Sequence, residues 1–162
     1  MARKVFFSFH FKRDSQRVSQ IRNCNAVSNH FEQTPFLDWA EWEKIERTGS
    51  TAIKRWIDNN MHGSGVVVLC FGLETHTREW VIYELEKAHK EGRGIVAIDM
   101  SGMKDLQGNI DKKGKNPLLV ATDIKGTELF YYAKYKTYHW IDDDGRNNID
   151  DWIEDAAVAA GR

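Results

Sequence analysis

The segment that most restricts the fold is the run Val66-Val67-Val68-Leu69-Cys70-Phe71, which carries no charged side chain. Gly65 precedes it and Gly72 follows it. A short, unbroken apolar run between glycines favours a strand buried on both faces. Such strands occur in parallel sheets that helices cover on both sides. We therefore expect an α/β fold built around this strand.

Strand-like and helix-like segments alternate along the rest of the chain. The expected strands are residues 5–9, 36–39, 66–71, 95–98 and 135–141, and the expected helices are residues 14–26, 53–61, 81–91 and 149–160. Asp14 or Ser15 and Ser50 are candidate helix caps. The polar residues 41–49 and the glycine-rich residues 101–128 are interpreted as connecting segments. This pattern predicts one three-layer, flavodoxin-like domain over residues 1–162, with a central, mainly parallel five-stranded sheet flanked by helices.

Composition narrows the classes of partner. The 23 basic and 24 acidic residues give a formal net charge of −1, so overall charge does not favour nucleic acid. No apolar run approaches the ~20 residues that span a bilayer, and the apolar run of residues 5–9 is too short for the core of a secretion signal. We expect no membrane partner and a soluble, cytoplasmic protein. Cys24 and Cys70 are the two cysteines, and a buried thiol is the favoured interpretation of Cys70.

Ligands of open parallel sheets bind beyond the carboxyl ends of the strands. The segments to consider are therefore residues 10–14, 38–48, 72–84 and 100–117. The third of these leads into a helix that carries Trp80 and Glu84. Residues four apart share one helix face, so this pair can form part of a nucleotide pocket.

Common cofactor motifs are absent from the sequence. The pair Gly63 and Gly65 and the pair Gly92 and Gly94 lack the third glycine of a dinucleotide-binding turn. The segment 108–115 lacks the spacing of a phosphate-binding loop. The six histidines show no metal-ligand spacing with cysteines or acids, so we expect no metal and no bound cofactor.

Several motifs, in order, resemble those of TIR-like domains, and most closely those of the ThsB family of Thoeris anti-phage defence. The resemblance runs from about residue 3 to 120. The matching pieces are Lys4-Val5-Phe6-Phe7-Ser8-Phe9-His10, Arg22-Asn23, Asp38 with Trp42-Glu43, Gly72 to Arg78 followed by Trp80-Val81-Ile82-Tyr83-Glu84, and two pieces between Lys104 and Pro117.

The resemblance implies an enzyme that takes NAD as substrate and cleaves its nicotinamide–ribose bond. It also implies a cyclic ADP-ribose isomer as product, a separate effector protein that this product activates, a phage protein as trigger, and self-association into a homo-oligomer. One carboxylate suffices for such a reaction, because nicotinamide leaves as a neutral molecule and needs no general acid. Glu84 is the expected catalytic residue. Its plainer interpretation is a glutamate on the solvent-exposed face of the helix.

The resemblance and the strand ends together give a set of expected substrate-binding residues. The set is Ser8, Phe9, His10, Asp38, Trp42, Trp80 and Asn116. Four of them also have a plainer interpretation. Ser8 can simply pack in its strand, His10 can be structural, Trp80 can pack between helix and sheet, and Asn116 can start a turn before Pro117.

Two other classes of protein are alternatives to an NAD-consuming enzyme. A non-catalytic TIR-like module would bind partners or a nucleotide without turning it over. A receiver-type domain is disfavoured, because it would end its first strand in an acidic pair and its third in an aspartate. This chain has His10 and Phe71-Gly72 there.

Overall fold

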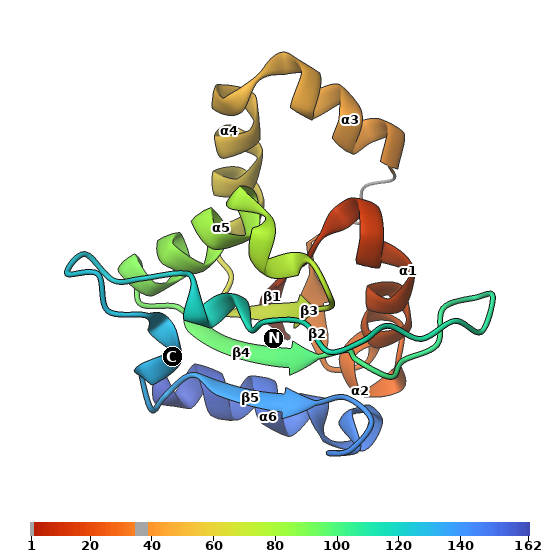
Figure 1. Cartoon of the computed structure of the whole chain (residues 1–162). Coiled ribbons are helices and arrows are strands. Elements are labelled where there is room, and N and C mark those ends of the chain that lie inside the picture. The colour runs from red at the N-terminus through yellow and green to blue at the C-terminus, as the bar shows by residue number, and fades with distance from the viewer. Residues whose placement is uncertain (1, 35–38) are drawn as a thin grey trace.

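A computed structural model describes residues 2–34 and 39–162, with the side chain of Trp39 left out (Figure 1). Its sheet has five strands in the order β2-β1-β3-β4-β5, and every pairing is parallel. The strands are β1 (Arg3–Ser8), β2 (Phe31–Gln33), β3 (Val66–Phe71), β4 (Gly94–Asp99) and β5 (Lys136–His139). The predicted α/β fold with a five-stranded parallel sheet is therefore confirmed.

Helices cover both faces of this sheet (Figure 1). The α-helices are α1 (Phe11–Arg22), α2 (Asn25–Ser28), α3 (Trp39–Thr48), α4 (Ser50–Met61), α5 (Glu79–Lys90) and α6 (Gly145–Ala159). Three short 3₁₀ helices are η1 (Thr75–Thr77), η2 (Pro117–Leu119) and η3 (Leu129–Tyr131). One apolar core joins the sheet to α1, α2 and α6, and a second core joins its other face to α4 and α5.

The central strand β3 supplies both cores. All six of its residues are buried. Val66, Val68 and Cys70 belong to the core beneath α1 and α6, whereas Val67, Leu69 and Phe71 belong to the core beneath α4 and α5. Side chains alternate between the faces of a strand, so an unbroken apolar run is what a strand with two buried faces requires. Cys70 is a buried free thiol, as expected.

The second strand was predicted in the wrong place. We expected it at residues 36–39, but β2 spans Phe31–Gln33 and Trp39 begins α3. Residues 35–38 lie outside the described part of the chain. The prediction was based on the apolar pair Phe36-Leu37. The strand contains Phe31 instead, whose buried ring packs in the same core as α1 and α2.

Two helices also differ from expectation. The first begins at Phe11 rather than Asp14, and the Asp14 amide donates to the His10 carbonyl inside the first turn. The polar residues taken as a connection form α3, because Trp42 and Ile45 lie one turn apart and pack on the second core. Gly49, rather than Ser50, occupies the N-cap of α4.

The long connection after β4 is tied to α1. Arg17 is buried and donates to the carbonyls of Met103 and Asn109, at 3.0 Å and 2.9 Å. Its guanidinium also lies 3.3 Å from an oxygen of Asp111. Further along, a Cβ on Gly114 would lie 2.0 Å from the Gly72 carbonyl oxygen. Only glycine permits this approach, which holds the connection against the carboxyl end of β3.

Candidate active site

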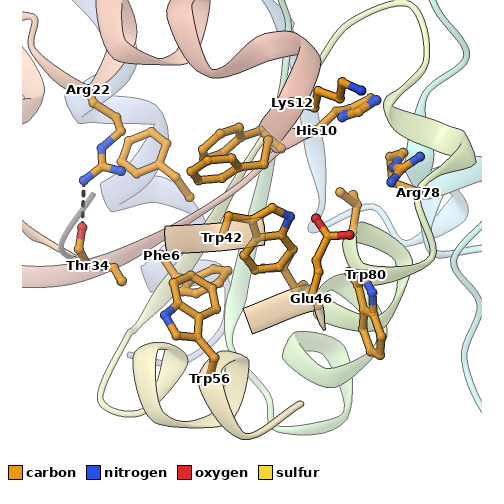
Figure 2. Close-up of a pocket in the computed structure, with 15 residues that line it drawn as sticks. Phe6, His10, Lys12, Arg22, Thr34, Trp42, Glu46, Trp56, Arg78 and Trp80 are labelled. Carbon is orange, nitrogen blue, oxygen red and sulfur yellow. Dashed lines mark hydrogen bonds between the residues drawn. The ribbon is translucent and has the colours of Figure 1, made fainter. Parts of the chain in front are cut away.

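A cavity of about 330 Å³ opens beyond the carboxyl end of β1, between α1, α3, α4 and α5 (Figure 2). Its size lies at the lower end of the range for small-molecule sites. The lining residues are Phe6, Phe7, Phe9, His10, Phe11, Lys12, Arg22, Thr34, Trp42, Glu46, Trp56, Arg78, Trp80, Val81 and Glu84. The cavity thus lies where the topology of an open parallel sheet predicts a ligand.

Glu84 is the buried acid of this cavity. It lies in the second turn of α5 and is only 7% exposed. Its Oε1 accepts a hydrogen bond of 3.1 Å from the Ser8 hydroxyl at the end of β1. Burial raises the pKa of Glu84 well above its usual range, and the Ser8 hydrogen bond opposes that rise. A carboxyl group in such surroundings is a recognised mark of a functional site.

Trp80 lies one helical turn before Glu84 and lines the same cavity. Its ring is half-buried and meets the ring of Tyr83 edge to face, with 5.8 Å between the centroids. Trp80 also packs against the second core. The residue therefore contributes to the cavity wall and to the packing of α5 at once.

Aromatic rings form a continuous chain across the cavity. Phe9 stacks on Phe11 and Phe11 stacks on Trp42, with 5.5 Å and 5.6 Å between centroids. Trp42 then meets Trp56 edge to face, and Trp56 lies against Phe6. These rings come from β1, α1, α3 and α4, so the cavity depends on all four elements. Flat apolar faces of this kind suit the rings of a nucleotide.

Charged side chains line both ends of the cavity, and Glu46 adds a carboxylate to its wall. Figure 2 shows His10, Lys12 and Arg78 gathered at one end of the cavity, and Arg22 at the other end with Trp42 between. Burial, and then the positive charge of Arg78, lower the pKa of His10. The imidazole is therefore neutral near pH 7, and the fixed positive charges at this end are those of Lys12 and Arg78.

The structure brings most of the expected site residues together. Phe9, His10, Trp42, Trp80 and Glu84 line the cavity from three separate parts of the sequence. Ser8 is not part of the cavity lining, but its hydroxyl hydrogen-bonds the lining residue Glu84. Asp38 lies outside the described residues.

Asn116 lies apart from the cavity lining. Its side-chain oxygen accepts from the Leu118 amide at 2.9 Å, as the cap of η2. Its side-chain nitrogen donates to the Thr137 hydroxyl at 3.0 Å. These bonds match the plainer interpretation of a residue that starts a turn, and substrate contact by Asn116 stays a prediction.

Ten of the fifteen lining residues were not among the expected site residues. Of these ten, Phe11 and Lys12 begin α1, Trp56 lies on α4, and Arg78 is the N-cap of α5. Arg78 could have been predicted as a lining residue, because it lies two residues before Trp80. No sequence signal would have found Trp56, because its apolar helical spacing is equally that of a core residue.

Metal-ligand clusters and membrane-spanning helices are both absent from the described part of the chain. No group of three or more histidine, cysteine, aspartate or glutamate side chains lies close enough to hold a metal ion there. No described helix has both the length and the apolar character needed to cross a membrane.

Fold and site together define a TIR-like domain, with a five-stranded parallel sheet and a glutamate one turn after a tryptophan at its carboxyl edge. The family model described as "Thoeris protein ThsB, TIR-like domain" matches residues 6–105, and the chain belongs to that family. The chain is also similar to a protein of Bacillus cereus (strain MSX-D12) named "Putative cyclic ADP-D-ribose synthase ThsB1". The two are 26% identical over 191 residues, which cover 94% of this chain and 100% of the relative.

Proposed function

We propose that this protein consumes NAD, cleaves its nicotinamide–ribose bond and forms cyclic ADP-ribose as a signal in anti-phage defence. A separate effector protein receives the signal, and a phage component triggers its production. The name of the Bacillus cereus relative and the ThsB family match support the product and the setting. Cyclisation, rather than hydrolysis, is the proposed fate of the ADP-ribosyl group.

The observation that carries the proposal is the buried carboxyl group of Glu84 in the wall of an aromatic cavity. In the reaction, the bond between the ribose carbon and the nicotinamide nitrogen breaks and its electron pair leaves with neutral nicotinamide. Positive charge then develops on the ribose. An ionised Glu84 beside the ribose stabilises that charge, an effect worth a few kcal/mol where water is excluded. An atom of the same ADP-ribose captures the cation in cyclisation, and water captures it in hydrolysis.

The remaining lining residues fit the parts of a dinucleotide. The rings of Trp42 and Trp56 line the cavity and offer aromatic surface for a base, whereas Phe11 already stacks with Phe9 and Trp42. One stacked base is worth ~1–3 kcal/mol in nucleic-acid complexes. Lys12 and Arg78 place positive charge at one end of the cavity, where it favours a diphosphate. Trp80 bounds the space beside Glu84.

The test is nicotinamide release from NAD by purified protein, alone and with extract of phage-infected cells. We expect Glu84→Gln to reduce release at least a hundredfold. The matched control is Glu86→Gln, two residues further on α5, where the carboxylate accepts from the Thr122 amide and a carboxamide oxygen can still do so. That variant should retain wild-type release. Equal release by wild type and Glu84→Gln would reject the proposal, and NAD binding without turnover would identify a nucleotide-binding module instead.

A further inference from the structure

Ser8 is the last residue of β1, and its side chain is separated from the cavity although its neighbours are not. Phe7 and Phe9 both line the cavity, whereas Ser8 is fully buried and is not part of the lining. Its hydroxyl lies 3.1 Å from Oε1 of Glu84. A substrate in the cavity would therefore meet Glu84 and not Ser8.

The hydrogen bond joins two elements that come from distant parts of the sequence. β1 supplies the donor and α5 supplies the acceptor, 76 residues later. Among the described residues, this is the one hydrogen bond that the Glu84 carboxylate accepts. A long, unbranched glutamate side chain has several rotamers, and a single fixed donor restricts which of them the carboxylate adopts.

We propose that Ser8 is the positioning residue of Glu84, which aims the carboxylate into the cavity and favours its charged form over its neutral form. The inference rests on the proposed function, in which the ionised carboxylate stabilises the ribose cation. A hydroxyl donor bonds more strongly to a carboxylate than to a neutral carboxyl group, so it offsets part of the loss of water around Glu84. Ser8 thereby acts on the reaction through Glu84 and without touching NAD.

The other titratable groups line the cavity or lie on elements that pack against α5. They are His10 after β1, Lys12 and Arg22 on α1, Glu46 on α3, Arg78 before α5, His76 on η1 and Asp99 at the end of β4. None of them hydrogen-bonds Glu84 among the described residues. Because all of them remain in a Ser8 variant, a change in the titration of Glu84 can be assigned to the lost hydroxyl.

The experiment compares Ser8→Ala and Ser8→Cys with wild type in the nicotinamide-release assay across pH. Cysteine keeps the branching of serine with a somewhat larger atom in place of the hydroxyl oxygen but donates weakly, so it separates the loss of the donor from the loss of the side-chain atom. We expect both variants to lose at least tenfold in kcat with KM for NAD changed less than twofold. The acid limb of the pH profile should move up by about one pH unit. Ser64→Ala is the matched control, because Ser64 is equally buried, lies before β3 at the opposite end of the sheet, and its hydroxyl has no partner among the described residues.

A second measurement requires no activity. The difference in unfolding free energy between wild type and Glu84→Gln should widen as pH rises through the ordinary glutamate range, and it should level off at the folded pKa of Glu84. With Ser8→Ala in both proteins, the levelling should move to higher pH. An unchanged levelling point, or a wild-type pH profile in Ser8→Cys, would overturn the inference. If wild type itself releases no more nicotinamide than Glu84→Gln, the proposed function fails, and the unfolding measurement still decides the role of Ser8.

Discussion

The indole of Trp42 stacks on the ring of Phe11, with 5.6 Å between centroids and 21° between the ring planes. This contact joins α3 to the start of α1 across the cavity. It matters because α3 otherwise packs mainly against α4 (Figure 1). The position of α3, and with it one wall of the cavity, therefore depends on a small number of rings.

Trp42→Ala should weaken both the fold and the binding of NAD. Loss of the stacked, half-buried indole should lower the free energy of unfolding by about 2 kcal/mol. The KM for NAD should rise about tenfold, because a stacking face is lost. Thermal unfolding and initial-rate kinetics measure the two effects. Tyr131→Ala, which removes a ring that is 68% exposed and distant from the cavity lining, is the control and should change neither.

Asp14→Asn should stabilise the protein near neutral pH. Asp14 is buried in α1, where its Oδ2 accepts from the Thr75 hydroxyl at 3.0 Å and its Oδ1 has no partner among the described residues. Burial raises the pKa of Asp14 to about 6. Between pH 4 and 6 the folded state then holds a proton that the unfolded state has lost, so wild-type stability falls as pH rises through this window.

Asparagine does not titrate, so the stability of the variant should not fall at this position as the pH rises. Its advantage over wild type should grow by about 3 kcal/mol from about pH 4 to pH 6 and stay constant above pH 6. Urea unfolding at a series of pH values measures it. A gap between the two proteins that does not depend on pH would show that Asp14 titrates normally in the folded state.

Arg17→Ala should destabilise the protein and make the connection after β4 more mobile. The buried guanidinium donates to two backbone carbonyls and pairs with Asp111. Its removal leaves the Met103 carbonyl without this donor, whereas the Asn109 carbonyl keeps the Asp105 amide and Asp111 keeps Arg13. We expect a loss of about 3 kcal/mol in stability and faster amide hydrogen exchange over residues 103–111. Arg47→Ala is the control, because its side chain is 81% exposed and its contact with Glu43 is 3.9 Å long. Slow exchange of residues 103–111 in Arg17→Ala would contradict the anchoring.

The strands that carry the sheet were predictable because burial on both faces leaves an unbroken apolar run, as in β3 and β4. β2 was not, because it is three residues long and only Phe31 in it is buried. α3 was also missed. A helix that packs along a narrow stripe around Trp42 and Ile45 leaves the rest of its surface polar, like a connecting segment.

The candidate site was predictable where a single helix or strand end carries it, as for Trp80 and Glu84 on α5. It was not predictable where the cavity depends on packing between elements. The stacking of Phe11 on Trp42 and the placement of Trp56 require the relative positions of α1, α3 and α4. The hydrogen bond between Ser8 and Glu84 was not predictable for the same reason, because it follows from how β1 faces α5.

The most direct test of the central claim is the mass balance of NAD in phage-infected cells that carry wild type, Glu84→Gln or Glu86→Gln. Mass spectrometry should find that wild type and Glu86→Gln convert NAD into equal amounts of nicotinamide and cyclic ADP-ribose after infection. Glu84→Gln should leave NAD intact. If cells carrying Glu84→Gln accumulate nicotinamide and cyclic ADP-ribose as wild type does, Glu84 does not perform the reaction and the account is wrong.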